Sequence, residues 1–315
     1  MMVVINDIEQ AALKINKYIH RTPVLTSSRL NNMFGCKMYF KCENFQRVGA
    51  FKFRGAINAV GNLDKQKLSK GVVTHSSGNH AQALALAAKI FKVPAYIVMP
   101  DNAPIVKIDA VRQYGGQITF CEPILEARES AAKMLIERHG ATFIHPYDNY
   151  DIIAGQGTCG KELLEQIDVE PDIVMTPVGG GGLLSGTAIS VKALTKATLV
   201  YAAEPIMADD AYRSFNAGKI IPQTNPRTIA DGLLTSLGEK TFPIIKSKVD
   251  KVLLCKEDSI FKAMRLIFEN LKIVVEPSAA VSLACVIDNP DEFKDKIVAL
   301  VLSGGNIDLT SFVWK

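Results

Sequence analysis

The sequence predicts an α/β protein built on parallel β-sheets. From about residue 70 onward, short runs of β-branched and apolar residues alternate with stretches that have helical patterns. These runs consist mainly of consecutive apolar residues, which is typical of parallel strands that helices cover on both faces. At 315 residues, the chain is also long enough for a large core and two domains.

The first part of this alternation predicts four strands and the helices between them. Strands are expected at residues 71–74, 95–99, 117–120 and 142–144. Helices are expected at residues 81–88, 104–114 and 124–139. The first helix is rich in strong helix formers such as alanine, and Gly140 ends the third as a C-terminal cap.

The second part continues the same pattern. A helix is expected around residues 159–167, and further strands at 173–175, 199–202 and 297–302. No internal repeat or low-complexity tract marks a boundary, so the domain limits follow from the topology. Residues 63–149 would form a small domain, and residues 1–62 and 150–315 would join in a large one.

Composition and charge exclude several classes of protein. The sequence is 48% hydrophobic and 22% charged, which is ordinary globular usage. Its formal charge of +4 is scattered, so neither nucleic acid nor a membrane surface is expected as a partner. The N-terminus lacks the basic region that opens a signal peptide, and no apolar stretch is long enough to span a bilayer.

The six cysteines are dispersed and form no Cys-x-x-Cys pair. In a chain of this length, such a distribution indicates reduced, mostly buried thiols in a cytoplasmic protein. Zinc is not expected, because His75 and His80 flank a glycine turn and do not share a helix face.

Lys52 lies between Phe51 and Phe53 in an unusual setting for a lysine. Apolar neighbours disfavour the ammonium form, and so does the cation Arg54, so both would lower the pKa of this amine. A neutral amine attacks carbonyl carbons, which is what an enzyme that works through a Schiff base requires. Taken alone, the segment fits better a surface lysine that extends along a helix while its neighbours pack.

Four consecutive glycines, Gly179 to Gly182, follow the predicted strand 173–175. They let the backbone approach an anion closely, and the helix that follows offers free amides and the positive end of its dipole. The loop is not a Walker loop, and its glycine spacing does not fit the dinucleotide fingerprint. We favour a cup for a phosphate monoester over a flexible turn, because flexible turns rarely lie between a buried strand and a helix.

Two other loops follow predicted strands. The segment from Ser76 to His80 offers amides, hydroxyls and a carboxamide that suit a carboxylate, although Ser and Asn are also ordinary helix caps. Ser303 is followed by two glycines at the end of the strand 297–302. Loops of this kind collect ligands at the carboxyl ends of the strands in open α/β sheets. The lysine, the phosphate cup, the carboxylate loop and the hydroxyl together predict pyridoxal phosphate as the cofactor.

These motifs resemble those of the fold-type II pyridoxal-phosphate enzymes, in the branch of serine racemases and serine/threonine dehydratases. The matching segments are 50–56, 76–80, 179–182 and 303–306, in the order that this family has them. The resemblance begins near Thr22 and extends to the C-terminus. It implies a tryptophan synthase β-like fold, with two doubly wound open-sheet domains and the cofactor in the cleft between them.

The resemblance also implies roles for individual residues. Lys52 would bind the cofactor covalently as a Schiff base, and Phe51 would lie beside its ring. Asn79 would hydrogen-bond the ring hydroxyl, and Ser303 would face the pyridine nitrogen. The backbone amides of Gly179, Gly180, Gly181, Gly182 and Leu183 would hold the phosphate. The substrate carboxylate would be bound by Ser76, Ser77, Asn79 and His80.

The chemistry of these residue types agrees with that family. A hydroxyl such as that of Ser303 cannot hold a fully charged pyridinium, so the ring is a weaker electron sink and suits prompt loss of a β-hydroxyl. Lys52 can take the α-proton. In the serine racemases, a serine at the position of Ser77 is the second acid/base, on the face opposite the lysine. Hydroxyaspartate dehydratases share this serine, and a helix-capping role for Ser77 is the alternative.

A divalent cation is the second expected cofactor. The resemblance implies that Glu204, the carbonyl of Ala208 and Asp210 bind it, and oxygen ligands of this kind suit Mg²⁺, or else Ca²⁺ or Mn²⁺. A solvated acidic loop is the alternative. Arg128 and Asp231 align with residues near the substrate in the racemases. Tyr147 departs from the small polar residue that some racemases have, which puts substrate preference in doubt.

The resemblance therefore implies an enzyme that removes water from a β-hydroxy amino acid, giving a 2-oxo acid and ammonia, with serine racemase activity as well. Candidate substrates are L-serine, L-threonine and threo-3-hydroxyaspartate, and a primary serine racemase is the alternative. A β-replacement enzyme like cysteine synthase fits less well, because it has an acid where Phe53 and Arg54 follow the lysine. The intact Lys52 and Ser77 disfavour a non-catalytic cofactor-binding protein. A homodimer is expected.

Overall fold

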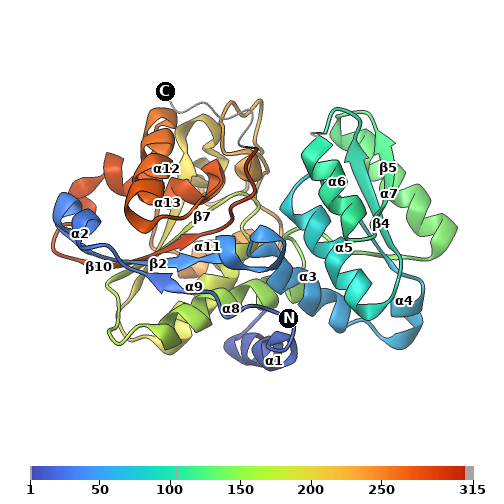
Figure 1. The fold of residues 1–315 in the computed structure, drawn as a ribbon, viewed down its shortest axis with the longest axis horizontal. Helices are drawn as coiled ribbons and strands as arrows, with labels where there is room; N and C mark the ends of the chain where they lie inside the picture. The colour runs from blue at the N-terminus through green and yellow to red at the C-terminus, as the bar shows by residue number, and fades with distance from the viewer. Residues whose placement is uncertain (1, 104, 309–315) are drawn as a thin grey trace.

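The structure is a computed structural model, and it describes residues 2–103 and 105–308. Two β-sheets lie side by side, and helices flank each of them (Figure 1). The six cysteines are free thiols, and five of them are buried. None of the helices in the described ranges is both long and apolar enough to cross a membrane.

The smaller sheet comes from one continuous stretch of chain. Its strands are β3 (Val72–His75), β4 (Ala95–Pro100), β5 (Gln117–Cys121) and β6 (Thr142–Phe143). All pairs are parallel, in the order β5-β4-β3-β6. The chain therefore moves outward from β3 and then returns to its other side for β6, which is a doubly wound arrangement.

Helices cover both faces of this sheet. They are α4 (Lys65–Ser69), α5 (Asn79–Phe91), α6 (Ile105–Gln113) and α7 (Leu125–His139). Val72 and Ile97 pack with α5 and α6, whereas their neighbours Val73 and Val98 pack with α7. Successive strand residues point to opposite faces, so strands covered on both sides are apolar throughout.

The larger sheet has six strands from distant parts of the chain. They are β1 (Val24–Leu25), β2 (Lys37–Cys42), β7 (Ile173–Pro177), β8 (Leu199–Pro205), β9 (Lys251–Cys255) and β10 (Ile297–Leu302). Their order is β1-β2-β10-β7-β8-β9. Five strands are parallel, as predicted, and β1, for which no strand range was predicted, pairs with β2 in the antiparallel sense.

Two helical layers enclose the larger sheet (Figure 1). The helices outside the smaller sheet are α1 (Ile5–Ile15), α2 (Ser28–Phe34), α3 (Lys52–Gly61), α8 (Tyr150–Gln166), α9 (Gly182–Leu194), α10 (Asp210–Ala217), α11 (Thr241–Lys248), α12 (Glu257–Leu271) and α13 (Pro277–Asp288). Met175 and Leu300 face the layer that includes α12 and α13. Val174 and Ala299 face the layer that includes α8 and α9.

Helix α3 connects the two parts of the core. Phe53 and Ile57 pack with α5 of the smaller sheet. On its other side, α3 approaches α8 so closely that a Cβ on Gly55 would lie 2.5 Å from Nε2 of Gln156. A Cβ on Gly155 of α8 would lie 2.6 Å from the carbonyl oxygen of Arg54. Only glycine allows the two backbones to approach in this way.

The predicted elements are present, with differences at their ends. The strands expected at 173–175 and 199–202 continue to Pro177 and Pro205, and the helix expected near 159–167 begins earlier, at Tyr150. Strand β9 was not predicted, and no residue ranges were predicted for β1 and β2. The two sheets lie on either side of the proposed limits 62/63 and 149/150, and these limits stay a prediction.

Candidate active site

The candidate site lies where the strands of the larger sheet end. Strand β10 runs parallel to β2 on one side and β7 on the other, so the segments that follow these strands emerge at the same edge. The backbone N–H of Phe51 donates to the carbonyl oxygen of Ser303 at 3.0 Å, and Ala50 forms a β-bridge with Gly304. Ser303 is buried. The lysine segment and the end of β10 are therefore in direct contact.

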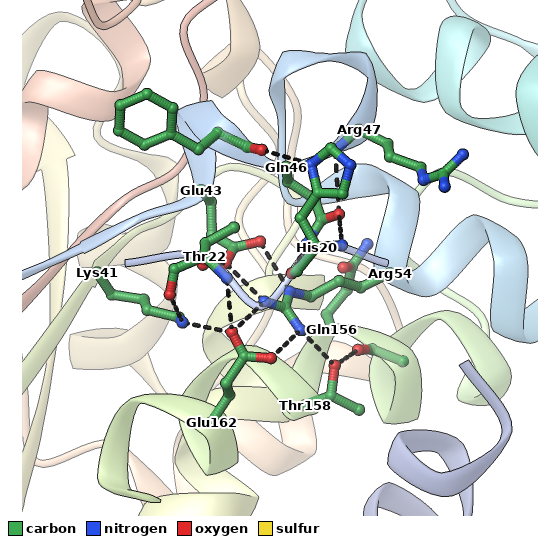
Figure 2. A network of polar contacts seen from close by, with 12 residues as sticks. His20, Thr22, Lys41, Glu43, Gln46, Arg47, Arg54, Gln156, Thr158 and Glu162 are labelled. Carbon is green, nitrogen blue, oxygen red and sulfur yellow. Dashed lines mark hydrogen bonds and ion pairs between the residues drawn. The ribbon is translucent and has the colours of Figure 1, made fainter. Parts of the chain in front are cut away.

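Lys52 is the first residue of α3 and is half-buried. Its Nζ donates to the carbonyl oxygen of Pro146 at 2.9 Å. Burial lowers the pKa of Lys52 to about 8, and the carboxylate of Glu276 opposes this shift. The expected low pKa is confirmed, and the interpretation as a surface lysine is wrong. The expected contribution of Arg54 is not found, because its guanidinium pairs with Glu43 and Glu162 beneath α3 (Figure 2).

The glycine loop follows β7 and leads directly into α9. Gly181 has φ +88°, a conformation that favours glycine. A Cβ on Gly180 would lie 2.3 Å from ring atoms of Tyr147, and one on Gly181 would lie 2.7 Å from Ile245. The loop therefore needs glycine for packing within the protein as well as for approach by a ligand.

Side chains outside the loop hold it in place. Thr241 Oγ1 donates to the carbonyl oxygen of Gly180 at 2.8 Å. Asp148 Oδ1 accepts from the backbone N–H of Lys240 at 2.7 Å and of Thr241 at 3.2 Å. Since Asp148 follows Pro146 and Tyr147, one short segment contacts both Lys52 and the glycine loop.

The loop after β3 leads into α5, whose N-cap is Gly78 and has no side-chain hydrogen bond. Ser77 therefore does not cap this helix, and the capping alternative is wrong. Ser76 Oγ accepts from the backbone N–H of Gly78 at 3.3 Å. A Cβ on Gly78 would have no neighbour within 4 Å, so the loop borders open space.

His80 lies in the first turn of α5 and is buried. Its Nε2–H donates a hydrogen bond to the carbonyl oxygen of Ile144, at 3.2 Å. Burial and the nearby ammonium of Lys52 hold the pKa of His80 well below its ordinary value. The ring is therefore neutral at physiological pH, and Nδ1 is left as an acceptor.

Glu276 is a part of the site that the sequence did not reveal. Its carboxylate accepts from Nδ2 of Asn79 at 2.9 and 3.0 Å and from the backbone N–H of Asn306 at 3.2 Å. It is 4% exposed, and burial raises its pKa to about 7. The sequence signal at this position is Pro277 after an acid, which indicates the start of a helix and nothing more.

The two residues assigned near the substrate have different positions. Asp231 forms an ion pair with Lys107 of α6, and the next residue, Gly232, packs against Gly179 of the glycine loop. Arg128 donates to the carbonyl oxygen of Pro123 at 3.5 Å. Within the described ranges, no hydrogen bond or ion pair joins Arg128 to Lys52 or to the glycine loop.

The expected metal ligands are close in the chain and buried. Both oxygens of Glu204 accept from backbone N–H groups at the start of α10, those of Ala211 and Tyr212, each at 2.8 Å. Asp210 accepts from the backbone N–H of Leu237 at 3.3 Å. Burial raises the pKa of Glu204 to about 9 and that of Asp210 to about 7.

This set has only two carboxylates and one backbone carbonyl, that of Ala208 in the short helix η3 (Ile206–Ala208). No cluster of three or more His, Cys, Asp or Glu side chains suited to a metal occurs in the part of the chain that the structure describes. Two buried acids together are costly unless a cation neutralises them, so the oxygen donors fit Mg²⁺.

The donors and acceptors of the site also fit pyridoxal phosphate. Among the described residues, the amides of Gly179, Gly180 and Gly181 donate to no protein atom, as is usual ahead of a helix. Two buried polar atoms, Thr176 Oγ1 in β7 and His80 Nδ1 in the first turn of α5, likewise have no protein partner. A phosphate and a polar ring would supply partners for such groups, and Lys52 supplies an amine that is half neutral near pH 8.

The family model described as "Pyridoxal-phosphate dependent enzyme" matches residues 15–304. The chain belongs to this family. Its predicted fold class, that of the fold-type II enzymes, is confirmed.

The similar proteins have related names. Serine racemase of Dictyostelium discoideum is 53% identical over 98% of this chain and 96% of its own length. Beta-hydroxyaspartate dehydratase of Paracoccus denitrificans is 48% identical over 98% of both chains. The solved structure of maize serine racemase has a TM-score of 0.96, with 45% identity over 99% of this chain and 96% of that chain.

Proposed function

We propose that this enzyme deaminates β-hydroxy amino acids, by loss of water followed by hydrolysis to a 2-oxo acid and ammonia, and that it also racemises serine. The names of its relatives support both activities: serine racemase in one case and hydroxyaspartate dehydratase in the other. The observation that carries the proposal is the position of Lys52. Its amine, with a pKa of about 8, feels the charge of the Glu276 carboxylate and contacts the segment that packs on the glycine loop.

Each residue of the site has a proposed role. Lys52 binds pyridoxal phosphate, with Phe51 beside the ring, Asn79 at the ring hydroxyl and Ser303 at the pyridine nitrogen. The backbone amides of Gly179, Gly180, Gly181, Gly182 and Leu183 hold the phosphate. Ser76, Ser77, Asn79 and His80 bind the substrate carboxylate, and Asp231 lies near the substrate. Arg128 is also proposed to lie near the substrate, although its observed contact is with Pro123.

The bound cofactor supplies an electron sink that makes the α-proton of the amino acid acidic. Lys52 takes this proton from one face, since its amine is neutral for much of the time above pH 8. If Ser77 returns a proton from the opposite face, the amino acid is inverted. If the β-hydroxyl leaves as water instead, the product hydrolyses to a 2-oxo acid and ammonia. Partly buried Ser76 can donate its hydroxyl to the carboxylate. Neutral His80 adds no second positive charge, and its Nε2–H would have to leave the carbonyl oxygen of Ile144 before it could donate to the carboxylate.

The remaining proposals concern metal, assembly and location. We propose that Mg²⁺, or Ca²⁺ or Mn²⁺, binds to Glu204, Asp210 and the carbonyl of Ala208. This would neutralise two acids whose burial is otherwise unfavourable. The substrate is a small amino acid, and the protein acts as a cytoplasmic homodimer.

The test is a substrate panel with the cofactor-loaded enzyme. L-Serine, L-threonine and threo-3-hydroxyaspartate are supplied separately, with Mg²⁺ or with a chelator, and 2-oxo acid, ammonia and D-serine are measured. We expect 2-oxo acid from at least one substrate and D-serine from L-serine. Absence of turnover on all three, with the cofactor shown to be bound by its absorbance, would overturn the proposal.

A further inference from the structure

A network of buried charges surrounds Arg54, which lies two residues after Lys52 in α3 (Figure 2). It consists of Lys41, Glu43, Arg54 and Glu162, which we call the buried ion-pair network. Lys41, Glu43 and Arg54 are 0% exposed, and Glu162 is 8% exposed. Two cations and two anions balance, so the network is electrically neutral. The proposed reaction uses none of these residues.

Arg54 is the centre of this network and uses all five of its N–H donors. Nε and Nη2 form a fork on Glu43, at 2.7 and 2.8 Å. Nη2 and Nη1 donate to the two oxygens of Glu162, at 2.9 and 3.2 Å. Nη1 also donates to Thr158 Oγ1 at 3.3 Å. A guanidinium with five bonds to three side chains has one orientation only.

These partners come from elements that flank the start of α3. Glu43 belongs to the short helix η1 (Glu43–Phe45) that follows β2, and Glu162 and Thr158 belong to α8. Thr158 Oγ1 donates in turn to the carbonyl oxygen of Gly155, the residue that packs against Arg54. Arg54 therefore ties the first turn of α3 to β2 and α8 together.

The first turn of α3 has no side-chain cap of its own. Its N-cap is Phe51, and no side chain caps it. Lys52 and Arg54 are two residues apart on a helix of 3.6 residues per turn, so they point about 200° apart. When Arg54 is fixed on one side, the direction in which Lys52 leaves the helix is fixed on the other. Its Nζ then meets the carbonyl oxygen of Pro146.

Stability alone is a poor explanation for four buried charges. A buried ion pair offsets little more than the cost of removing its charges from water, and packed apolar side chains often replace it without loss of stability. What such a pair does add is a defined geometry. We propose that the fork between Arg54 and Glu43 is a positioning device for Lys52, which holds the amine at the depth and direction that the reaction requires.

This inference rests on the proposed function of Lys52, but part of its test does not need turnover. Three variants loosen the fork to different degrees: Arg54→Lys, Arg54→Met and Glu43→Gln. Arg54→Lys keeps the charge and loses the planar fork. Lys41→Met is the control, because Lys41 belongs to the same buried network but bonds Glu162, Gln166 and Thr22 and not Arg54.

The first measurement uses the cofactor-free protein. Trace labelling of Lys52 by an acylating reagent, followed by mass spectrometry of its peptide at pH values on both sides of 8, gives its pKa. Burial keeps this pKa at about 8, so a loosened first turn that admits water should raise it toward the ordinary value of 10.5. Lys41→Met should lower thermal stability without moving the pKa of Lys52. If the fork between Arg54 and Glu43 served stability alone, all four variants would lower thermal stability and none would move the pKa of Lys52.

The second measurement uses the cofactor-loaded enzyme. We expect kcat for serine to fall about 10-fold to 100-fold in Arg54→Lys and Glu43→Gln, with little change in KM, because displacement of a reacting group by about 1 Å costs as much as 100-fold. The visible circular dichroism of the bound cofactor should change with kcat. Unchanged Lys52 labelling and unchanged kcat in both variants would overturn the inference, even if Arg54→Met fails to fold. An inactive wild type would refute the proposed function. The labelling of Lys52 would still decide whether the fork positions its amine.

Discussion

Asn79 donates Nδ2 to both oxygens of Glu276, at 2.9 and 3.0 Å. Asn79 begins α5 on the smaller sheet, and Glu276 immediately precedes α13 on the larger sheet. This pair therefore connects the two halves of the molecule beside Lys52. Asn306 strengthens the link, because its Nδ2 donates to Oδ1 of Asn79 at 2.8 Å and its backbone N–H donates to Glu276.

Replacing Glu276 with glutamine should lower the pKa of Lys52 further. The Glu276 carboxylate favours the ammonium form of Lys52, so its loss leaves burial unopposed. The labelling curve of Lys52 in the cofactor-free protein should move to lower pH. Glu292→Gln, which removes an acid paired with Lys251 on the surface, is the control and should leave the curve in place. A shift to higher pH in Glu276→Gln would contradict the expected sign.

Capture of pyridoxal phosphate by the cofactor-free protein should depend on pH through Lys52. Only the neutral amine reacts, and its fraction grows about tenfold per pH unit below the pKa. The rate, followed by absorbance, should therefore rise up to pH 8 and level off above it. His80 should add no second step, because its pKa lies well below its ordinary value. A rate that does not change between pH 6 and 8 would show that another group controls capture.

Ser77→Ala should separate the two activities. Inversion needs a proton donor on each face, whereas loss of water needs only the removal of one proton and departure of the hydroxyl. D-Serine formation should fall by about 100-fold or more, while pyruvate formation from L-serine persists. Ser76→Ala is the matched control and should reduce both products together. Parallel loss of both products in Ser77→Ala would assign Ser77 to substrate binding instead.

Gly180→Ala should destabilise the protein, because its methyl group would meet the Tyr147 ring at 2.3 Å. Overpacking of this kind costs about 1–3 kcal/mol of unfolding free energy, which urea denaturation can measure. Adding Tyr147→Ala should recover part of the loss. Gly78→Ala is the comparison, since a methyl group there would meet no atom within 4 Å. Equal losses in the two glycine variants would argue against a steric cause.

Mg²⁺ should stabilise the wild type against heat, and Asp210→Asn should remove most of this effect. A cation that binds only the folded protein adds about 2.7 kcal/mol at 100 times its Kd. Asp209→Asn is the control, because Asp209 pairs with Arg213 and is not among the proposed ligands. If Asp210→Asn responds to Mg²⁺ as the wild type does, the cation binds elsewhere.

The sequence was sufficient for strands such as β7 and β10, which are buried on both faces. An apolar run such as that around Val174 can bury the side chains on both of its faces when it is a parallel strand between two helical layers. The start of α8 was missed for the opposite reason. Gly155, Gly157 and Gly160 weaken its helical pattern, yet α3 and α9 pack so closely on it that larger residues would collide.

The parts of the site that belong to a local sequence motif could be predicted. Lys52 and the glycine loop belong to local patterns, and their chemistry follows from residue type. Glu276 was not predictable, because it reaches the site through folding and has no motif of its own. Arg54 was wrongly expected to lower the pKa of Lys52. The sequence does not show that its side chain points away from Lys52 and pairs with Glu43.

The position of β10 has a consequence for the order in which the protein folds during its synthesis. The ribosome makes β2 and β7 well before β10, which pairs with both of them at the middle of the larger sheet. The smaller sheet is continuous in the chain and can form early. Until β10 emerges, β2 and β7 have unpaired edges of the kind that aggregate. We therefore expect a stage in synthesis at which the smaller sheet can form while the larger sheet still lacks the strand that joins β2 to β7.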